Sequence, residues 1–233
     1  MNRTPTEQQL AIVAAPDRLR DDTVLDGGRK PAELLAFLDL KPGMRVAELM
    51  AGYGYTSELI GRAVGPTGEV YAQNNRFVLE KFLEPAWTER LALPQMANVK
   101  RLDRELEAPF PAEVEDLDMV VVVLFYHDTY WQKVDRAQMN EAIYRVLAPG
   151  GSYVVIDHSA RPGAGADQVQ TLHRVEEALV REEIEAAGFV LREQSSFLRN
   201  DDDARDWNAS PAAAEQAGKR GTSDRFVLRF VKP

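Results

Sequence analysis

Hydrophobic residues along the chain follow two kinds of pattern, which together predict an α/β protein. The longest apolar run, Met119 to Phe125, includes four consecutive valines, and such a run is typical of a central strand buried on both faces of a parallel sheet. Shorter strand-like runs lie at 45–50, 69–72, 98–102 and 153–157. Segments with apolar residues at helical spacing lie at 31–40, 56–64, 77–83, 135–147 and 167–187. Strands and helices therefore alternate, and we expect the strand at 118–126 to lie centrally in a doubly wound sheet.

The end of the chain has a different pattern. The last two strand-like segments, Phe189 to Leu198 and Arg225 to Val231, are joined by a polar loop of residues 199–224 rather than by a helical segment. Strands connected without a crossover helix can pair antiparallel. The predicted fold class is therefore α/β, with a doubly wound, mainly parallel sheet and an antiparallel last strand.

Composition restricts the chemistry. The chain has 233 residues, no cysteine, and 37 acidic against 28 basic residues, which gives a net charge of -9. The lack of cysteine excludes a disulfide scaffold, a thiol nucleophile and an iron–sulfur site. The acidic balance argues against a nucleic-acid partner, because such binding depends on Lys and Arg. No apolar run approaches the roughly 20 residues that span a bilayer, and the N-terminus lacks a signal-peptide core, so we expect a soluble cytoplasmic protein.

A glycine-bearing loop follows the first core strand, between Glu48 and Gly54. Gly52 and Gly54 let the main chain approach a ligand just before a helix begins, and Glu48 can receive a cationic group. A tight turn without a ligand is the alternative.

Two polar residues follow the next two strands. Asn74 stands about 20 residues after Gly54, where nucleotide-binding folds place a ribose-binding side chain. Asp103 can accept a hydrogen bond from an adenine amino group. A loop cap and a solvated aspartate are the respective alternatives.

These segments together resemble the class I S-adenosylmethionine-dependent methyltransferases, and most closely a bacterial group of predicted methyltransferases of unknown substrate. The resemblance extends from about Arg29 to the C-terminus. The motifs that carry it are Lys41-Pro-Gly-Met-Arg-Val-Ala-Glu48, Gly52-Tyr-Gly54, Gly68-Glu-Val-Tyr-Ala-Gln-Asn74, Arg145-Val-Leu-Ala-Pro-Gly-Gly151 and the terminal strand pair. The bacterial group also matches Tyr126-His-Asp128, Asp157-His158, Leu172-His-Arg174 and Asp224-Arg-Phe-Val.

The resemblance implies a seven-stranded sheet with S-adenosylmethionine lying over the carboxyl ends of the first three strands. Glu48 would face the methionyl amine, Asn74 the ribose and Asp103 the adenine. The implied cofactor contacts are Glu48, Met50, Ala51, Gly52, Gly54, Asn74, Asp103 and Leu124. Met50 stands where the family has a further glycine, and Asn74 stands where it usually has an acidic residue. The first departure leaves less room beneath the methionyl group, and the second makes the ribose contact a neutral hydrogen bond.

Histidine is the second candidate for chemistry. The chain has three histidines, and His127 and His158 follow two adjacent core strands, beside Asp128 and Asp157. At the carboxyl ends of a parallel sheet, such a histidine can act as a general base while an aspartate orients its ring. We predict His127, His158 and Asp128 as catalytic residues, with a structural role as the alternative for each.

The third histidine, His173, lies early in the helix predicted at 167–187. Three histidines with Asp128 or Asp157 could bind a divalent metal. The close i, i+4 spacing of a recognisable metal motif is absent, so we predict no metal site and interpret His173 as a capping or surface residue. The loop from Asn200 to Ser223 is long enough to act as a lid, and a solvated loop is the alternative.

The preferred hypothesis is methyl transfer from S-adenosylmethionine to a small-molecule acceptor, with oxygen slightly preferred as the acceptor atom and a histidine as general base. One alternative is a cofactor-binding module without turnover. Another is a nicotinamide-dependent oxidoreductase, which is disfavoured because Ser57 stands where its third glycine would lie. We expect residues 1–30 to form an N-terminal lid or arm and residues 31–233 to form one cofactor-binding domain. The expected partner is a small molecule, with neither nucleic acid nor membrane, and a homodimer stays open.

Overall fold

The computed structural model describes residues 2–233 and contains a seven-stranded sheet in the order β3-β2-β1-β4-β5-β7-β6. Neighbouring strands run parallel, except that β7 is antiparallel to both β5 and β6. The predicted fold class is thereby confirmed. The strands are β1 (Arg45–Leu49), β2 (Glu69–Asn74), β3 (Val99–Asp103), β4 (Leu117–Val123), β5 (Leu147–His158), β6 (Val190–Ser195) and β7 (Arg225–Val231).

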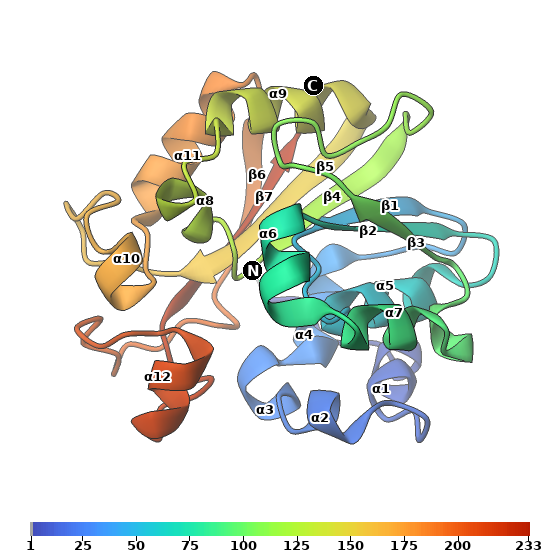
Figure 1. The fold of residues 1–233 in the computed structure, drawn as a ribbon, viewed down its shortest axis with the longest axis horizontal. Helices are drawn as coiled ribbons and strands as arrows, with labels where there is room; N and C mark the ends of the chain where they lie inside the picture. Colours follow the sequence, from blue (N-terminus) through green and yellow to red (C-terminus); the bar gives the residue numbers. More distant parts are fainter. Residues whose placement is uncertain (1) are drawn as a thin grey trace.

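Helices cover both faces of the sheet (Figure 1). The helices are α1 (Glu7–Val13), α2 (Arg20–Thr23), α3 (Asp26–Arg29), α4 (Pro31–Leu38), α5 (Tyr55–Val64), α6 (Arg76–Val78), α7 (Ala86–Leu91), α8 (Asp128–Trp131), α9 (Arg136–Val146), α10 (Val169–Leu172), α11 (Glu177–Ala186) and α12 (Pro211–Gln216). A π-helical turn, η1 (Leu79–Leu83), follows α6, and a 3-10 turn, η2 (Pro94–Met96), follows α7. None of the helices in residues 2–233 has the length and apolar character needed to cross a membrane.

The central strand β4 explains the layered arrangement. Val120 and Val122 pack into the core with side chains of α9 and α11, whereas Val121 packs on the opposite face with side chains of α4 and α5. Successive side chains of a strand point to opposite faces, so the run of valines is buried on both, as the sequence predicts. Burying each valine stabilises the fold by about 1.5–3 kcal/mol.

The helix predicted at 167–187 is wrong in one respect, because the structure has two helices there with a break between them. His173 ends α10 in a left-handed conformation (φ 51°). The next residue, Arg174, is fully buried and pairs with Asp203 of the loop that precedes β7 (2.8 Å). The Leu172 carbonyl accepts from the Ala209 N–H of the same loop (2.9 Å). Contacts to this loop therefore replace the hydrogen bonds that would have continued the helix.

The N-terminal segment and the loop before β7 meet beside the sheet. Arg90 of α7 pairs with Asp22 of α2 (2.5 Å) and so anchors the N-terminal helices. Helix α12 of this loop lies on the same side of the molecule as α3 of the N-terminal segment (Figure 1). The main chains of the two segments approach each other closely at Gly28 and Gly221. A Cβ atom on Gly28 would lie only 2.6 Å from the Gly221 Cα, so the contact leaves no room for a side chain there. Two segments far apart in sequence thus close one end of the molecule together.

Candidate functional site

The loop after β1 is held by side chains at the end of β2. The Gly52 N–H donates to Asn74 Oδ1 (2.9 Å), and Asn74 Nδ2 donates back to the Gly52 carbonyl (3.1 Å). The Met50 N–H donates to Gln73 Oε1 (3.1 Å). Because the Asn74 side chain has no exposed surface (0%), contact with a ribose requires a shift of the neighbouring loop.

This loop turns through left-handed conformations at Met50 (φ 52°), Gly52 (φ 59°) and Gly54 (φ 83°). Such a conformation costs a residue with a side chain about 1–2 kcal/mol, so Met50 is strained. A Cβ on Gly54 would lie 2.6 Å from the Trp87 ring, whereas a Cβ on Gly52 would meet no atom within 4 Å. The loop is therefore packed tightly at Gly54 and borders open space at Gly52, where a ligand can approach the main chain.

Glu48, at the end of β1, is a buried acid with a strongly changed proton affinity. Its side chain is only 3% exposed and accepts a hydrogen bond from Ser57 Oγ. Burial raises the pKa of Glu48 to about 7, although the hydrogen bond from Ser57 and the charge of Arg29 favour the carboxylate. An ammonium group beside Glu48 would stabilise the charged form further.

Three further residues are predicted to contact the cofactor: Ala51, Asp103 and Leu124. Ala51 continues the loop, and its N–H donates to the Gln73 carbonyl (2.9 Å). Asp103 lies beside Asn74 in the register of β2 and β3, but its carboxylate pairs with Arg101 (2.7 Å) and is half-exposed. Leu124 follows β4 in a left-handed conformation (φ 58°). The structure thus joins the β1 and β2 residues by hydrogen bonds and leaves Asp103 at the outer strand.

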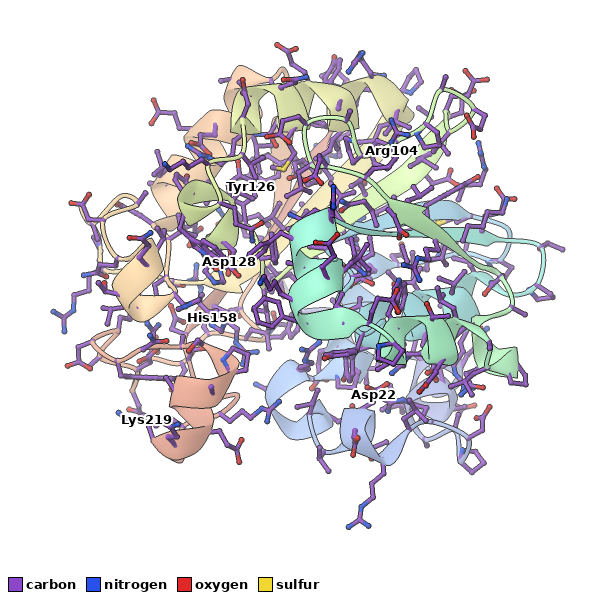
Figure 2. All side chains as sticks on the ribbon, viewed as in Figure 1. Asp22, Arg104, Tyr126, Asp128, His158 and Lys219 are labelled. Atoms are coloured by element: carbon purple, nitrogen blue, oxygen red, sulfur yellow. The ribbon has the colours of Figure 1, made fainter. Side chains whose placement is uncertain are left out.

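The three histidines gather at the carboxyl ends of β4 and β5. His127 Nδ1 lies 2.7 Å from Asp157 Oδ1, and the His127 main-chain N–H donates to Asp157 Oδ2 (2.7 Å). On the other side of the ring, His127 Nε2 lies 3.2 Å from His173 Nδ1 and 3.1 Å from Asp128 Oδ1. The His158 ring lies 5.7 Å from the His127 ring, centroid to centroid. Asp128 and His158 are labelled in Figure 2, in the region between α8 and α12.

Carboxylates dominate the electrostatics of this cluster. Burial opposes a charge on His127, but the carboxylates of Asp157 and Asp128 outweigh burial and raise the pKa of His127 to about 10. Burial likewise opposes the charge on Asp128, but hydrogen bonds from His127 and His173 hold the pKa of Asp128 well below its usual range.

His158 has the opposite character. Its Nδ1 lies 2.7 Å from Ser223 Oγ. Burial, together with the positive charges of His127, Arg225 and Arg174, lowers the pKa of His158 well below its ordinary value. His158 is therefore the neutral histidine of the pair at the strand ends.

A cavity of about 370 Å³ lies beside His158. Its walls include Leu124 at the end of β4, Arg29 of α3, and Trp207 and Arg225 from the C-terminal part of the chain. Ligand pockets commonly have volumes of roughly 300–1,000 Å³, so this cavity fits one small molecule. The N-terminal segment and the loop before β7 form its outer walls.

Two arginines in this cavity form no direct ion pair with a carboxylate among residues 2–233, although carboxylates farther away act on both through their charge. Arg29 stacks on the Tyr55 ring (4.5 Å from guanidinium carbon to ring centroid) and, among residues 2–233, forms neither a side-chain hydrogen bond nor an ion pair. Arg225 is 4% exposed, and within the described part of the chain its side chain donates only to the carbonyls of Ser223 (3.2 Å) and Gly221 (2.9 Å). Burial and the charge of Arg29 lower the pKa of Arg225 to about 10. A ligand anion beside Arg225 would favour its charged form and so offset both effects.

Sequence reasoning missed Arg29, Arg225 and Ser223 as site residues. For Arg225 a signal was present, because it belongs to the Asp224-Arg-Phe-Val motif and begins the strand that pairs with the end of β5, with His158 opposite Arg225. Arg29 and Ser223 lie in segments without strong periodicity, and only the folded chain brings them to His158.

Comparison with known proteins supports the fold at low sequence identity. No family model and no curated protein matches the chain. A SAM-dependent methyltransferase from Aquifex aeolicus is 19% identical, with 98% of this chain and 100% of that chain covered and a TM-score of 0.63. A TehB-like SAM-dependent methyltransferase from Corynebacterium glutamicum is 14% identical, with 96% of this chain and 94% of that chain covered and a TM-score of 0.55. Aeropyrum pernix fibrillarin with natively bound S-adenosyl-L-methionine is 15% identical, with 82% of this chain and 67% of that chain covered and a TM-score of 0.52. The chain therefore has the class I methyltransferase fold that its motifs predict.

Proposed function

We propose that this protein transfers the methyl group of S-adenosylmethionine to a small-molecule acceptor, with an oxygen atom as the preferred acceptor. The observation that carries the proposal is the cavity of about 370 Å³ in which a neutral histidine, His158, faces a ligand-sized space at the carboxyl ends of the central strands. The likeness in fold to methyltransferases supports the choice of cofactor.

The cofactor site in this proposal is the loop after β1. Glu48 would bind the methionyl ammonium group, and the main chain at Gly52 and Gly54 would approach the cofactor closely. Asn74 would hold the loop and, after a local shift, meet the ribose. Asp103 would bind the adenine amino group after its carboxylate turns from Arg101. When bound, S-adenosylmethionine supplies an electrophilic methyl group on a sulfonium.

His158 is the proposed general base. With Nδ1–H donated to Ser223 Oγ, the Nε2 lone pair is free to take a proton from an acceptor hydroxyl. Because the pKa of His158 is lowered, the ring is neutral at physiological pH and available for this role. His127 and Asp128, which are paired with each other, would position the strand ends rather than accept the proton.

The acceptor in this proposal carries an anionic group. Arg29 and Arg225 both border the cavity, and neither forms a direct ion pair with a carboxylate among residues 2–233. A carboxylate on the acceptor would satisfy both guanidinium groups and orient its hydroxyl toward His158. The net charge of -9 supports a small acceptor over a nucleic acid.

The N-terminal segment is the proposed lid of this cavity, because α3 contributes Arg29 to its wall and meets the opposite wall at Gly28 and Gly221. The cytoplasmic location stays a prediction of the sequence, and whether the protein forms a homodimer stays open.

Incubation of the protein with isotopically labelled S-adenosylmethionine and a small-molecule extract of the source cell tests the proposal. We expect label in an anionic small molecule with the wild-type protein and little with the His158→Ala variant, while both bind S-adenosylhomocysteine equally. Cofactor binding without any labelled product would favour the module without turnover, and label in RNA or protein would contradict the small acceptor.

A further inference from the structure

Three side chains at the end of β4 and beyond α10 place one donor atom each around a common point. His127 Nε2 lies 3.2 Å from His173 Nδ1 and 3.1 Å from Asp128 Oδ1, and His173 Nδ1 lies 3.3 Å from Asp128 Oδ1. Ligands about 2.0–2.2 Å from one metal ion are separated by roughly 3–3.5 Å when they subtend the angles of octahedral or tetrahedral coordination. The three separations in this cluster therefore match those of three ligands of a single ion.

Two neighbouring side chains hold the proposed ligands in place by hydrogen bonds, as outer residues do in metal sites. His127 Nδ1 lies against Asp157 Oδ1 (2.7 Å), so the ring can donate its Nδ1–H there and leave the Nε2 lone pair toward the cluster. Trp131 Nε1 donates to Asp128 Oδ1 (2.6 Å). An outer carboxylate on a ligating histidine is a common feature of metal sites.

The charges around the cluster also favour a cation. Asp128 and Asp157 are both buried or nearly so, with side chains 17% and 0% exposed. Within residues 2–233 neither carboxylate forms an ion pair with a lysine or an arginine. Two carboxylates need two positive charges for neutrality; a proton on His127 supplies one, whereas a divalent ion in place of that proton supplies both. The His173 side chain is 25% exposed, which leaves a path for an ion to enter.

We propose that His127 Nε2, Asp128 Oδ1 and His173 Nδ1 bind a divalent transition-metal ion, with water in the remaining positions. Two imidazoles and one carboxylate, with no thiolate, suit Zn²⁺, Mn²⁺ or Fe²⁺. Asp157 is the outer residue that orients His127.

The ion would clamp the wall of the cavity. His173 stands between Leu172, whose carbonyl accepts from the Ala209 N–H (2.9 Å), and Arg174, whose Nε donates to the Trp207 carbonyl (3.2 Å). Trp207 and Ala209 both line the cavity. An ion on His173 therefore ties this wall to the end of β4, and this role is independent of the cofactor.

The test uses the full-length, tag-free protein after treatment with a chelator, in the absence of S-adenosylmethionine. Titration with ZnCl₂ by calorimetry should show one ion per chain, and Co²⁺ should give the visible absorption of a ligated ion. Loss of a ligand in Asp128→Asn or His173→Gln should weaken binding about 100-fold or more, and Asp157→Asn should weaken it about 10- to 100-fold. Asp206→Asn is the matched control, because the Asp206 carboxylate is exposed (54%) and pairs with Arg161 rather than with a residue of the cluster.

Absence of binding at about 1 mM Zn²⁺, Mn²⁺ and Fe²⁺, or equal binding by wild type, Asp128→Asn and His173→Gln, would overturn the proposal. In that case the cluster is held by hydrogen bonds around a protonated His127. Near-ultraviolet circular dichroism shows whether each variant is folded, and the Co²⁺ spectrum of the wild type tests ligation without any variant. Because no cofactor is used, either result leaves the proposed methyl transfer to its own test.

Discussion

At the edge of the sheet where the parallel strands end, polar groups are paired differently in the half formed by β1 and β2 and in the half formed by β4, β5 and β7. At the ends of β1 and β2, amide side chains and main chain satisfy one another, as Asn74 and Gly52 do. At the ends of β4 and β5 and the start of β7, charged groups face a cavity, and within residues 2–233 Arg225 forms no direct ion pair with a carboxylate. A satisfied network fixes a shape, whereas a buried unpaired charge costs free energy until a ligand compensates it. We infer that the first half holds the cofactor and the second half receives the acceptor and carries the chemistry.

The largest expected effect is on catalysis in the second half. Replacing His158 with alanine removes the proposed base, so kcat should fall by about 10²- to 10⁴-fold. Affinity for S-adenosylhomocysteine should stay at the wild-type value, because His158 is assigned to the acceptor side. Steady-state kinetics with the acceptor and calorimetry with S-adenosylhomocysteine measure the two effects. A wild-type kcat in the variant would break the assignment of roles to the two halves.

The next effect concerns the stability of the cavity wall. Arg174 and Asp203 form a buried ion pair with side chains 0% and 1% exposed. Arg174→Met leaves Asp203 buried without its partner, so the free energy of unfolding should fall by about 3–5 kcal/mol. The control is Arg181→Met, which removes the exposed pair with Glu185 (3.0 Å) and should cost less than about 1 kcal/mol. Equal losses in urea unfolding of the two variants would contradict the buried pair's importance.

A pH-dependent effect should appear in the first half at Glu48. Its pKa is about 7 in the folded protein against an ordinary value of 4.5. Between these two values the folded chain binds more protons than the unfolded chain, so this group makes the free energy of unfolding fall as pH rises through that window. At pH values above this window the wild type has lost that stability, because Glu48 is buried and charged. Glu48→Gln carries no charge, so its free energy of unfolding should exceed that of the wild type by up to about 3 kcal/mol.

Urea unfolding of wild type and Glu48→Gln on both sides of this window measures the difference. At about pH 4 the two proteins should have similar stability, because the glutamate is then largely protonated in both states. Glu185→Gln is the control, because it removes a partly exposed carboxylate paired with Arg181 and keeps Glu48, so the fall in stability that Glu48 causes in this window should remain. A constant difference between wild type and Glu48→Gln at all pH values would refute the raised pKa.

The smallest effect is expected for the amide network. Asn74→Ala removes both hydrogen bonds to Gly52, so the free energy of unfolding should fall by about 1–3 kcal/mol. Asn74→Asp keeps an acceptor for the Gly52 N–H but buries a carboxylate against the Gly52 carbonyl, so it should lose at least as much. Thermal unfolding compares the two variants with the wild type, and an Asn74→Ala variant as stable as the wild type would show that these two hydrogen bonds do not hold the loop.

The sequence predicted the fold well because the pattern and the packing agree. The valines of β4 form one continuous run and are buried on both faces, and Arg225 to Val231 forms the antiparallel strand that its connection predicts. The helix predicted at 167–187 failed at His173, because local periodicity does not register the ion pair of Arg174 with Asp203, about 30 residues later.

The candidate site was predictable only in part. His127, Asp128 and His158 follow strands whose ends meet, so their proximity follows from topology. The approach of His173 to His127 depends on the break after α10, and the approach of Arg29 to Arg225 depends on packing of the N-terminal helices against the loop before β7. No spacing along the chain encodes either contact.

Calorimetric titration of the purified protein with S-adenosylhomocysteine tests the central claim most directly, since it measures the cofactor site without any knowledge of the acceptor. The account predicts one binding site per chain, with weaker binding in Glu48→Ala and unchanged binding in His158→Ala. Absence of binding at about 1 mM ligand, or binding unaffected by Glu48→Ala, would contradict it.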